Sequence, residues 1–141
     1  FEQRGLLHVP VHWHGLAVEV VVIHFGLAHA SRVRQVERLA EFVERELDPA
    51  APLLVAGDFN DWGERLDGPL REAGLRRAVA PAGGPASRRR SLTFPSLAPV
   101  FALDRVYTRG LRCASTFVPR GATWARMSDH LPLVAEFMLD G

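Results

Sequence analysis

The chain is 141 residues long, the size of one domain, and carries a net charge of +1 with 48% hydrophobic and 23% charged residues. A charge this close to zero excludes an overall basic field of the kind that draws proteins to nucleic acid. The single cysteine, Cys113, excludes a disulfide framework and a four-cysteine zinc site, and no apolar run reaches the ~18 residues of a membrane-spanning helix.

The first half of the sequence predicts a strand, a helix and a second strand. Residues 16–24 form a run rich in β-branched side chains, which indicates a buried strand. Residues 31–47 then place apolar side chains at helical spacing, with Ser31 as the expected N-cap and Pro49 as the stop. Residues 53–57 predict a second buried strand. A unit of this length is typical of a parallel crossover.

This crossover predicts where a site would form. His24 ends the first strand and Asp58 follows the second. If the strands are parallel, their carboxyl ends lie at the same edge of the sheet, where ligands of open α/β sheets bind. The pattern therefore places an imidazole and a carboxylate at one candidate site.

The rest of the chain predicts short strands joined by loops. Residues 67–75 predict a short helix that ends at Gly74, and the proline- and glycine-rich residues 81–99 predict a long surface loop. Arg109 and Gly110 predict a tight hairpin between the two strands that flank them. Strands are expected at residues 4–12, 101–107, 111–118 and 133–139.

Three short stretches carry residues suited to chemistry: GDFN (57–60), LDR (103–105) and SDH (128–130). Asp58 and Asn60 are two residues apart, so on an extended segment they would point the same way. Carboxylate and amide oxygens together suit a hard divalent cation or a water oriented for attack. An Asx-turn after the strand is the structural alternative for this pair.

His130 needs partners from elsewhere in the chain. Asp129 and His130 are adjacent, so a turn is required to bring both side chains into one site. A carboxylate must fix the tautomer of His130, and Asp104 is the candidate. The structural alternatives are a capped turn for His130, a surface ion pair with Arg105 for Asp104, and a core histidine for His24.

In this order, the strand ending in His24, the GDFN, LDR and SDH stretches, and the Leu131-Pro132 that follows, resemble the endonuclease/exonuclease/phosphatase superfamily of deoxyribonuclease-I-like metal-dependent phosphohydrolases. GDFN with a downstream SDHxPL is the specific part of the match. The resemblance implies an α/β fold, a four-layer sandwich to which this chain contributes one mixed sheet with flanking helices. It also implies that residues 1–141 are the C-terminal portion of a single domain, without the N-terminal half and its metal-binding glutamate.

The resemblance further implies hydrolysis of a phosphoester bond by attack of water on phosphorus. His24 would hydrogen-bond a phosphate oxygen. Asp58 would orient or deprotonate the water, and Asn60 would stabilise the developing charge. Asp104 would orient His130, which would contact the phosphate or act as an acid or base.

The metal implied is Mg²⁺, with Mn²⁺ as the alternative, held by Asp129, Asp58 and Asn60. The substrate class stays open among nucleic acid, a lipid head group and a small phosphoester. We expect a cytoplasmic protein, with export and membrane association left open. A half-sandwich exposes a sheet face, which predicts self-association. The alternative function is a catalytically incomplete fragment or a non-catalytic interaction module.

Other residues have two readings each. His12 and His14 would share a strand face that zinc could use, but exposed histidines on an edge strand explain them better. The arginines at 88–90 would contact phosphate or anionic lipid, or lie in a solvated loop. Residues 93–95 would shape a substrate pocket or pack a loop, and Cys113 is expected to be buried.

Overall fold

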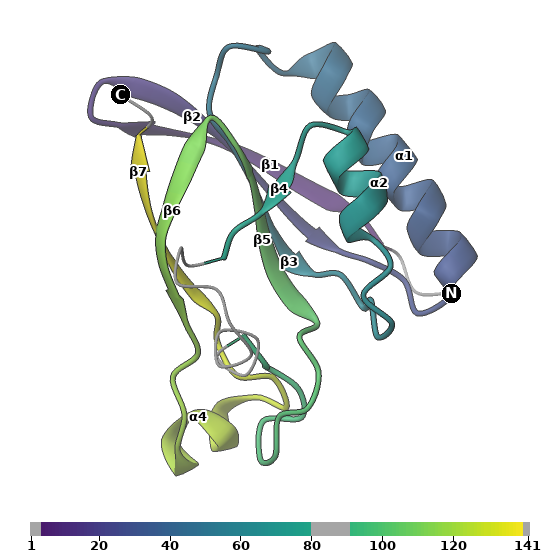
Figure 1. Cartoon of the computed structure of the whole chain (residues 1–141), viewed down its shortest axis with the longest axis vertical. Coiled ribbons are helices and arrows are strands. Elements are labelled where there is room, and N and C mark those ends of the chain that lie inside the picture. The colour runs from purple at the N-terminus through teal and green to yellow at the C-terminus, as the bar shows by residue number, and fades with distance from the viewer. Residues whose placement is uncertain (1–3, 80–90, 140–141) are drawn as a thin grey trace.

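The computed structural model describes residues 4–79 and 91–139, whose strands form two sheets (Figure 1). One is a mixed five-stranded sheet in the order β1-β2-β3-β5-β4, and the other pairs β6 with β7. Strands β2 and β3 are parallel, which confirms the predicted crossover, and the other pairs are antiparallel. The strands are β1 (Leu6–Trp13), β2 (Leu16–His24), β3 (Leu53–Asp58), β4 (Arg76–Arg77), β5 (Asp104–Arg109), β6 (Leu111–Phe117) and β7 (Val134–Leu139).

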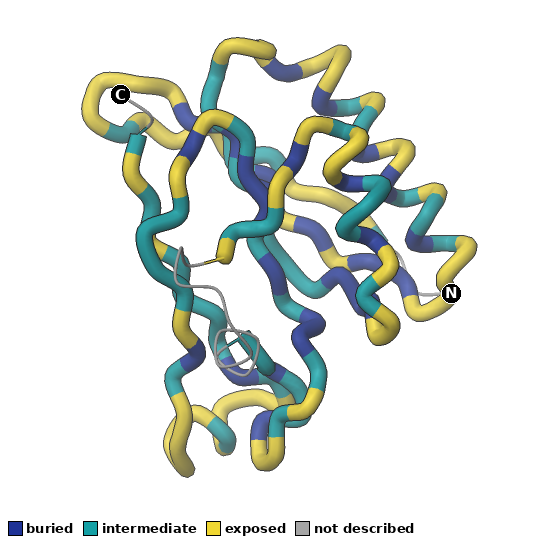
Figure 2. The backbone as a smooth tube through the Cα atoms, viewed as in Figure 1, coloured by how far each residue is buried: buried dark blue, intermediate teal, exposed yellow. Residues whose placement is uncertain are grey.

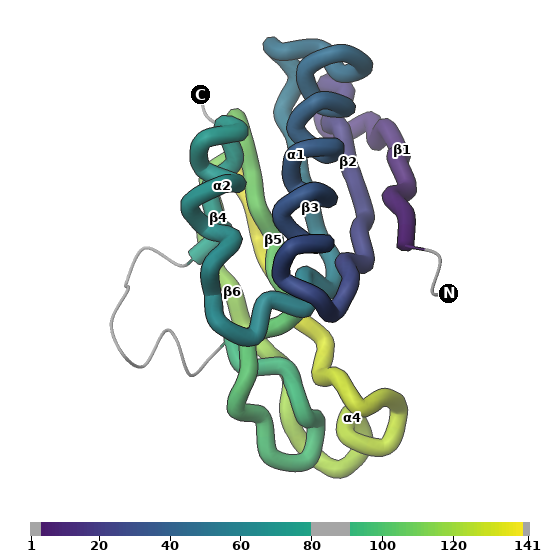
Figure 3. The backbone as a smooth tube through the Cα atoms, turned by 90° about the vertical axis from the view of Figure 1, so that its right-hand side faces the viewer, coloured from purple at the N-terminus to yellow at the C-terminus, as the bar shows by residue number. Residues whose placement is uncertain are grey.

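Helices α1 (His29–Glu46) and α2 (Asp67–Glu72) cover one face of the five-stranded sheet (Figure 3). The core lies between these helices and the sheet, where buried segments gather (Figure 2). Alternate strand residues point toward the helices. Another helix, α4 (Ala122–Met127), precedes β7. The core side chains include Val21, Ile23, Val36, Leu39, Val43, Leu53, Val55, Phe59, Leu70 and Tyr107. No helix in the described ranges is long and apolar enough to cross a membrane.

The opposite face of the sheet is partly uncovered. Val18, Val20 and Leu54 border an apolar pocket of about 210 Å³ together with Leu111 of β6 and Phe137 of β7. Toward β1 this face is open, and its exposed apolar side chains are Leu7, Val9, Val11, Leu16 and Val22. The structure therefore has the exposed sheet face that the sequence predicts, and self-association through it stays a prediction.

The predicted N-cap of α1 is wrong, because the helix begins at His29, after Ala28, and not after Ser31. Side chains from inside the helix hold the preceding turn instead. The Gly26 N–H donates to Gln35 Oε1 at 2.9 Å, and Arg32 donates to the carbonyls of Gly26 and Leu27. These bonds supply the local satisfaction that an N-cap hydroxyl provides in other helices.

The predicted hairpin at Arg109 and Gly110 is also wrong. Gly110 does turn the chain, at a φ of 71°. However, β5 already pairs with β3 on one side and β4 on the other, so neither edge is left for β6. The chain crosses to the second sheet, where β6 pairs with β7. Strand β5 also begins at Asp104 and not at residue 101, and α2 ends at Glu72, two residues before Gly74.

Gly57 permits the close approach of β2 and β3. Its φ is 146°, and a Cβ there would fall 1.9 Å from the carbonyl oxygen of Ile23. We predict that Gly57→Ala lowers the free energy of unfolding by about 3 kcal/mol, because the two strands must separate. Urea unfolding measures it. Gly68→Ala, at a position with open space around it, is the matched control, and equal stability of the two variants would contradict the prediction.

Candidate active site

Three polar side chains form a row across the sheet. His24 ends β2, Asp58 ends β3 and Asp104 begins β5. In the strand register His24 is opposite Asp58, and Asp58 is opposite Asp104. Residues opposite one another on neighbouring strands point to the same face, which here is the face away from α1 and α2. The predicted meeting of an imidazole and a carboxylate at this edge is confirmed.

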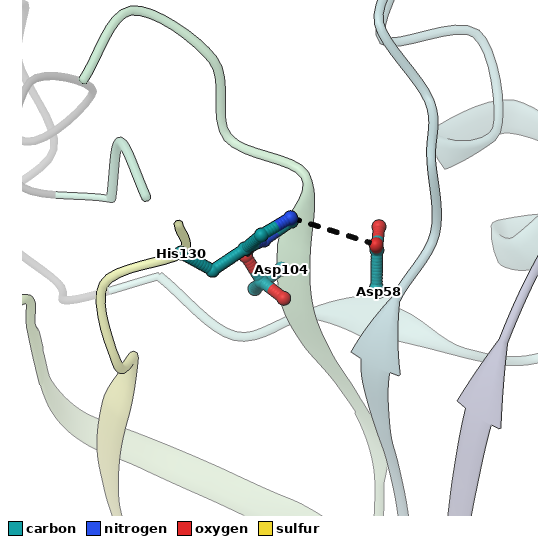
Figure 4. Close-up of side chains that lie close together, drawn as sticks. All are labelled: Asp58, Asp104 and His130. Carbon is teal, nitrogen blue, oxygen red and sulfur yellow. Dashed lines mark hydrogen bonds and ion pairs between the residues drawn. The ribbon is translucent and has the colours of Figure 1, made fainter. Parts of the chain in front are cut away.

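His130 joins the row from the bend before β7 (Figure 4). Its Nδ1 lies 2.7 Å from Asp104 Oδ2, and its Nε2 lies 3.9 Å from Asp58 Oδ2. An ionised carboxylate only accepts hydrogen bonds, so Nδ1–H donates to Asp104 and Nε2 faces Asp58. The His130 N–H donates to Ser128 Oγ at 3.1 Å, which fixes the turn that the sequence requires.

Thr93 contacts the site aspartate Asp104, a contact that the sequence did not predict. Its buried hydroxyl donates to Asp104 Oδ2 at 2.6 Å. The ring of the next residue, Phe94, lies 4.9 Å from the His130 ring, centroid to centroid. Residues 93 and 94 therefore hold the Asp104–His130 pair from behind. Nothing in their spacing to Asp104 along the chain signals this contact.

Asn60 does not extend alongside Asp58 as predicted. Its φ is 47°, so the chain turns sharply after the strand. Its N–H donates to Asp58 Oδ1 at 2.8 Å, which is the Asx-turn alternative. Its buried side chain donates through Nδ2 to the carbonyl of Phe25 at 2.8 Å. Asn60 therefore fastens the ends of β2 and β3 together, and its role toward charge or metal stays a prediction.

His24 lies on the surface and not in the core, with 59% of its side chain exposed. Its Nε2 lies 3.6 Å from Asp58 Oδ2 and accepts a hydrogen bond from Arg4 NH1. Arg4 thus brings a cation to the row. Arg4 could not be predicted from the sequence, because it belongs to none of the motifs and reaches His24 only through the pairing of β1 with β2.

The pKa values of Asp58 and His130 are both raised, which favours the neutral form of the carboxyl and the charged form of the imidazole. Burial, reinforced by the negative charge of Asp104, raises the pKa of Asp58 above its ordinary value, although hydrogen bonding by Asn60 and the two histidines oppose this. Burial alone would lower the pKa of His130. The hydrogen bond and charge of Asp104, with smaller contributions from Asp58 and Asp129, outweigh it and raise that pKa.

The cluster fits a divalent cation. Ligand atoms of Asp58, Asp104 and His130 all lie within 4.8 Å of one another, and two of the three are carboxylate oxygens. Among the described residues no other group of three histidine, cysteine or acidic side chains comes this close. Asp129 is exposed and lies outside this group. Ligation by Asp129 and by Asn60 stays a prediction.

The remaining residues for which the sequence suggested a role lie away from the Asp58–Asp104–His130 cluster or outside the described part of the chain. His12 is exposed on the edge strand β1, and His14 lies beyond the strand at a φ of 49°, so the predicted shared face is wrong. Cys113 is half-buried in β6. Residues 88–90 lie outside the described part of the chain. Arg105 does not pair with Asp104 at the surface, because it is buried on the other face of β5.

A groove of about 530 Å³ opens beside the cluster. Asp104 and His130 line it, with Ala56 and Val106 of the sheet and Trp124 of α4. Ala56 and Val106 are each two residues from a site aspartate on the same strand, so they share its face. The groove therefore offers apolar surface next to the charged row.

The model of the Endonuclease/Exonuclease/phosphatase family matches residues 3–130. The chain belongs to this family. A curated relative, the uncharacterized protein YbhP of Escherichia coli K12, is 39% identical over 141 residues, which are 98% of this chain and 54% of YbhP. The chain therefore spans about half the length of this relative.

Two solved structures share the fold. The chain matches D. rerio TDP2 complexed with single strand DNA product at a TM-score of 0.70 and 16% identity, over 96% of this chain and 62% of TDP2. It matches the Bacteroides thetaiotaomicron mannosyl-6-phosphatase Bt3783 at a TM-score of 0.65 and 16% identity, over 89% of this chain and 53% of Bt3783. The expected α/β class is confirmed, with about half of the full family fold present.

Because the pKa of His130 is raised, the free energy of unfolding of the protein depends on pH. The stabilisation from charged His130 beside Asp104 is complete below the ordinary imidazole pKa and is lost as the pH rises through the raised value. We predict that His130→Gln lowers the free energy of unfolding more at about pH 6 than at about pH 9. Urea unfolding at both pH values measures it. His12→Gln controls for loss of an imidazole, and equal losses for His130→Gln at both pH values would contradict the prediction.

Proposed function

We propose that the protein hydrolyses phosphoester bonds by directing a water at phosphorus, with a divalent cation as cofactor. The observation that carries this proposal is the meeting of Asp58, Asp104 and His130, from three separate motifs, within 4.8 Å. The family fold, which is that of phosphoester hydrolases, supports it.

Asp58 is the residue that we assign to the attacking water. Its pKa is raised, so the carboxylate accepts a proton more readily than an ordinary surface aspartate does. The N–H of Asn60 holds Oδ1, which leaves Oδ2 facing the histidines at 3.6 Å and 3.9 Å. This fixed orientation suits a base that must hold one water in line with a scissile bond.

His130 and His24 are assigned to the phosphoryl group. Asp104 fixes the His130 tautomer, so Nε2 points into the row and contacts a phosphate oxygen. At the other end of the row, Arg4 supplies positive charge, and His24, whose Nε2 accepts from Arg4, is left with Nδ1–H to donate to a phosphate oxygen. The water on Asp58 then lies between two groups that stabilise negative charge on the phosphoryl oxygens.

Mg²⁺ is the proposed cofactor, with Mn²⁺ as a substitute, and the carboxylates of Asp58 and Asp104 supply the oxygen ligands that these ions prefer. Asp129 adds a carboxylate next to His130, as the resemblance implies. When bound, the cation supplies positive charge against the charge that develops on the phosphoryl oxygens.

The substrate chemistry is that of a phosphoester. One relative of the same fold was solved with a single strand DNA product, and another is named a mannosyl-6-phosphatase. The first is a nucleic acid and the second acts on a sugar phosphate. A generic diester and a generic monoester, bis(p-nitrophenyl) phosphate and p-nitrophenyl phosphate, therefore test the proposal without presuming the alcohol.

A second candidate function is a catalytically incomplete unit. One observation favours it: the chain spans 54% of YbhP, so the relative has residues with no counterpart here. Such a unit would keep the row of side chains and yet not turn over either substrate.

We predict that the chain hydrolyses at least one of the two substrates with Mg²⁺ or Mn²⁺, and that EDTA stops the reaction. Asp58→Asn and His130→Gln are each expected to lower kcat about 100-fold or more, because each removes a group that acts on the reacting atoms. Release of p-nitrophenol measures the rate. His12→Gln, outside the site on β1, is the matched control. Full activity in Asp58→Asn would contradict the assigned site, and absence of metal-dependent turnover by the chain would favour the incomplete unit.

A further inference from the structure

A buried arginine lies directly behind the candidate site. Arg105 follows Asp104 on β5, so its side chain points to the opposite face of the sheet, toward the helices. Only 1% of the side chain is exposed. An arginine is almost never buried this fully unless its charge and its N–H groups are satisfied.

The partners of Arg105 belong to the two segments that carry the site aspartates. Its Nε donates to the carbonyl of Ala102 at 2.8 Å, two residues before Asp104. NH1 donates to Asp61 Oδ2 at 2.8 Å, and NH2 donates to the Asp61 carbonyl at 2.9 Å, three residues after Asp58. One guanidinium therefore ties the turn that leaves β3 to the turn that enters β5.

Asp61 is held as firmly as its partner. Its side chain is fully buried, and Oδ2 also accepts the Leu66 N–H at 2.9 Å. Burial would raise its pKa, but these hydrogen bonds, one of them from Arg105, hold the pKa below its ordinary value. Asp61 therefore stays ionised and stays in place.

A second arginine, Arg77, pairs with two acidic residues, Glu64 and Asp67, that also lie 4.0 Å and 3.9 Å from the Arg105 guanidinium. Arg77 on β4 bonds Glu64 at 3.1 Å and Asp67 at 3.5 Å, and Tyr107 donates to Asp67 as well. Within the described residues, the hydrogen bonds of Arg77 go to Glu64 and Asp67 and not to Asp61 or Ala102. Arg77 shares the charge environment of Arg105 without tying together the segments that carry the site aspartates.

We propose that Arg105 is a positioning residue of the candidate site, whose guanidinium fixes Asp58 against the Asp104–His130 pair by clamping the turns at residues 61 and 102. The effect on catalysis rests on the proposed function, whereas the effect on the Asp104–His130 geometry does not. Lysine retains the charge but is a point donor, so it cannot reproduce the planar set of bonds to Ala102, the Asp61 side chain and the Asp61 carbonyl at once.

The test compares Arg105→Lys with the matched control Arg77→Lys in the 141-residue chain. The first readout needs no turnover: NMR measures exchange with water of the His130 Nδ1–H proton that Asp104 accepts. We expect exchange about tenfold faster in Arg105→Lys and unchanged in Arg77→Lys, because only the first loosens the turn that carries Asp104. Exchange through global unfolding speeds up as small amounts of urea are added, so the comparison uses the part of the exchange rate that does not change with urea.

The second readout is hydrolysis of bis(p-nitrophenyl) phosphate. We expect Arg105→Lys to lower kcat about 100-fold with KM nearly unchanged, because a shift of about 1 Å at the reacting groups affects the transition state and not substrate binding. Arg77→Lys keeps the kcat of the unmodified chain.

Asp61→Asn is the second variant, since it removes the charge on the other side of the clamp and is read in the same way if Arg105→Lys does not fold. Faster exchange in either variant, with the Arg77→Lys signal unchanged, supports the proposal. Exchange that is unchanged in both Arg105→Lys and Asp61→Asn, or in whichever of them folds, overturns it, as does an equal effect in Arg77→Lys. Failure of the proposed function gives a different result: no turnover in any variant, with the NMR difference intact.

Discussion

The register between three strands is the constraint on which the candidate site depends. His24, Asp58 and Asp104 share a row only because β2, β3 and β5 pair with these residues opposite one another. Two backbone bonds continue the ladder past the strand ends, from Phe25 N–H to the Asp58 carbonyl and from Phe59 N–H to the Leu103 carbonyl, both at 2.9 Å. A slip of one residue in any strand would send its side chain to the helix face.

The two faces of the same strands carry different chemistry. On the open face, burial and then the negative charge of Asp104 raise the pKa of Asp58. On the helix face Asp61 meets the guanidinium of Arg105 and two backbone N–H groups, so its pKa falls. Two aspartates three residues apart thus differ in proton affinity, because burial dominates at Asp58 whereas hydrogen bonds from backbone N–H groups and Arg105 outweigh burial at Asp61. Pairs with diverging pKa values are typical of functional sites.

The sequence predicts the parts of this structure that follow from local pattern. The run of residues 16–24 and the helical spacing after it give the parallel crossover, and the crossover brings His24 and Asp58 together. The contacts of Thr93 and Arg4 with the row depend on pairings between distant segments, which no local period encodes. The same holds for Arg105, for which the sequence suggested a surface ion pair with Asp104. At Gly110 the predicted turn is present, but the strand that follows it pairs with β7 and not with β5. Asn60 does not continue the extended strand, because its N–H donates to Asp58 Oδ1 in an Asx-turn.

Asp58, Asp104 and His130 are proposed to form one site for a divalent cation and a phosphoester. Titration of Mn²⁺ into the ¹⁵N-labelled chain tests this proposal, because the paramagnetic ion broadens the amide signals of nearby residues. We expect the signals of residues 58–60, 104 and 130 to broaden first, at Mn²⁺ concentrations below that of the protein, and we expect Asp58→Asn to remove the effect. Broadening that begins at His12 and His14, or spreads evenly over the surface, would contradict it.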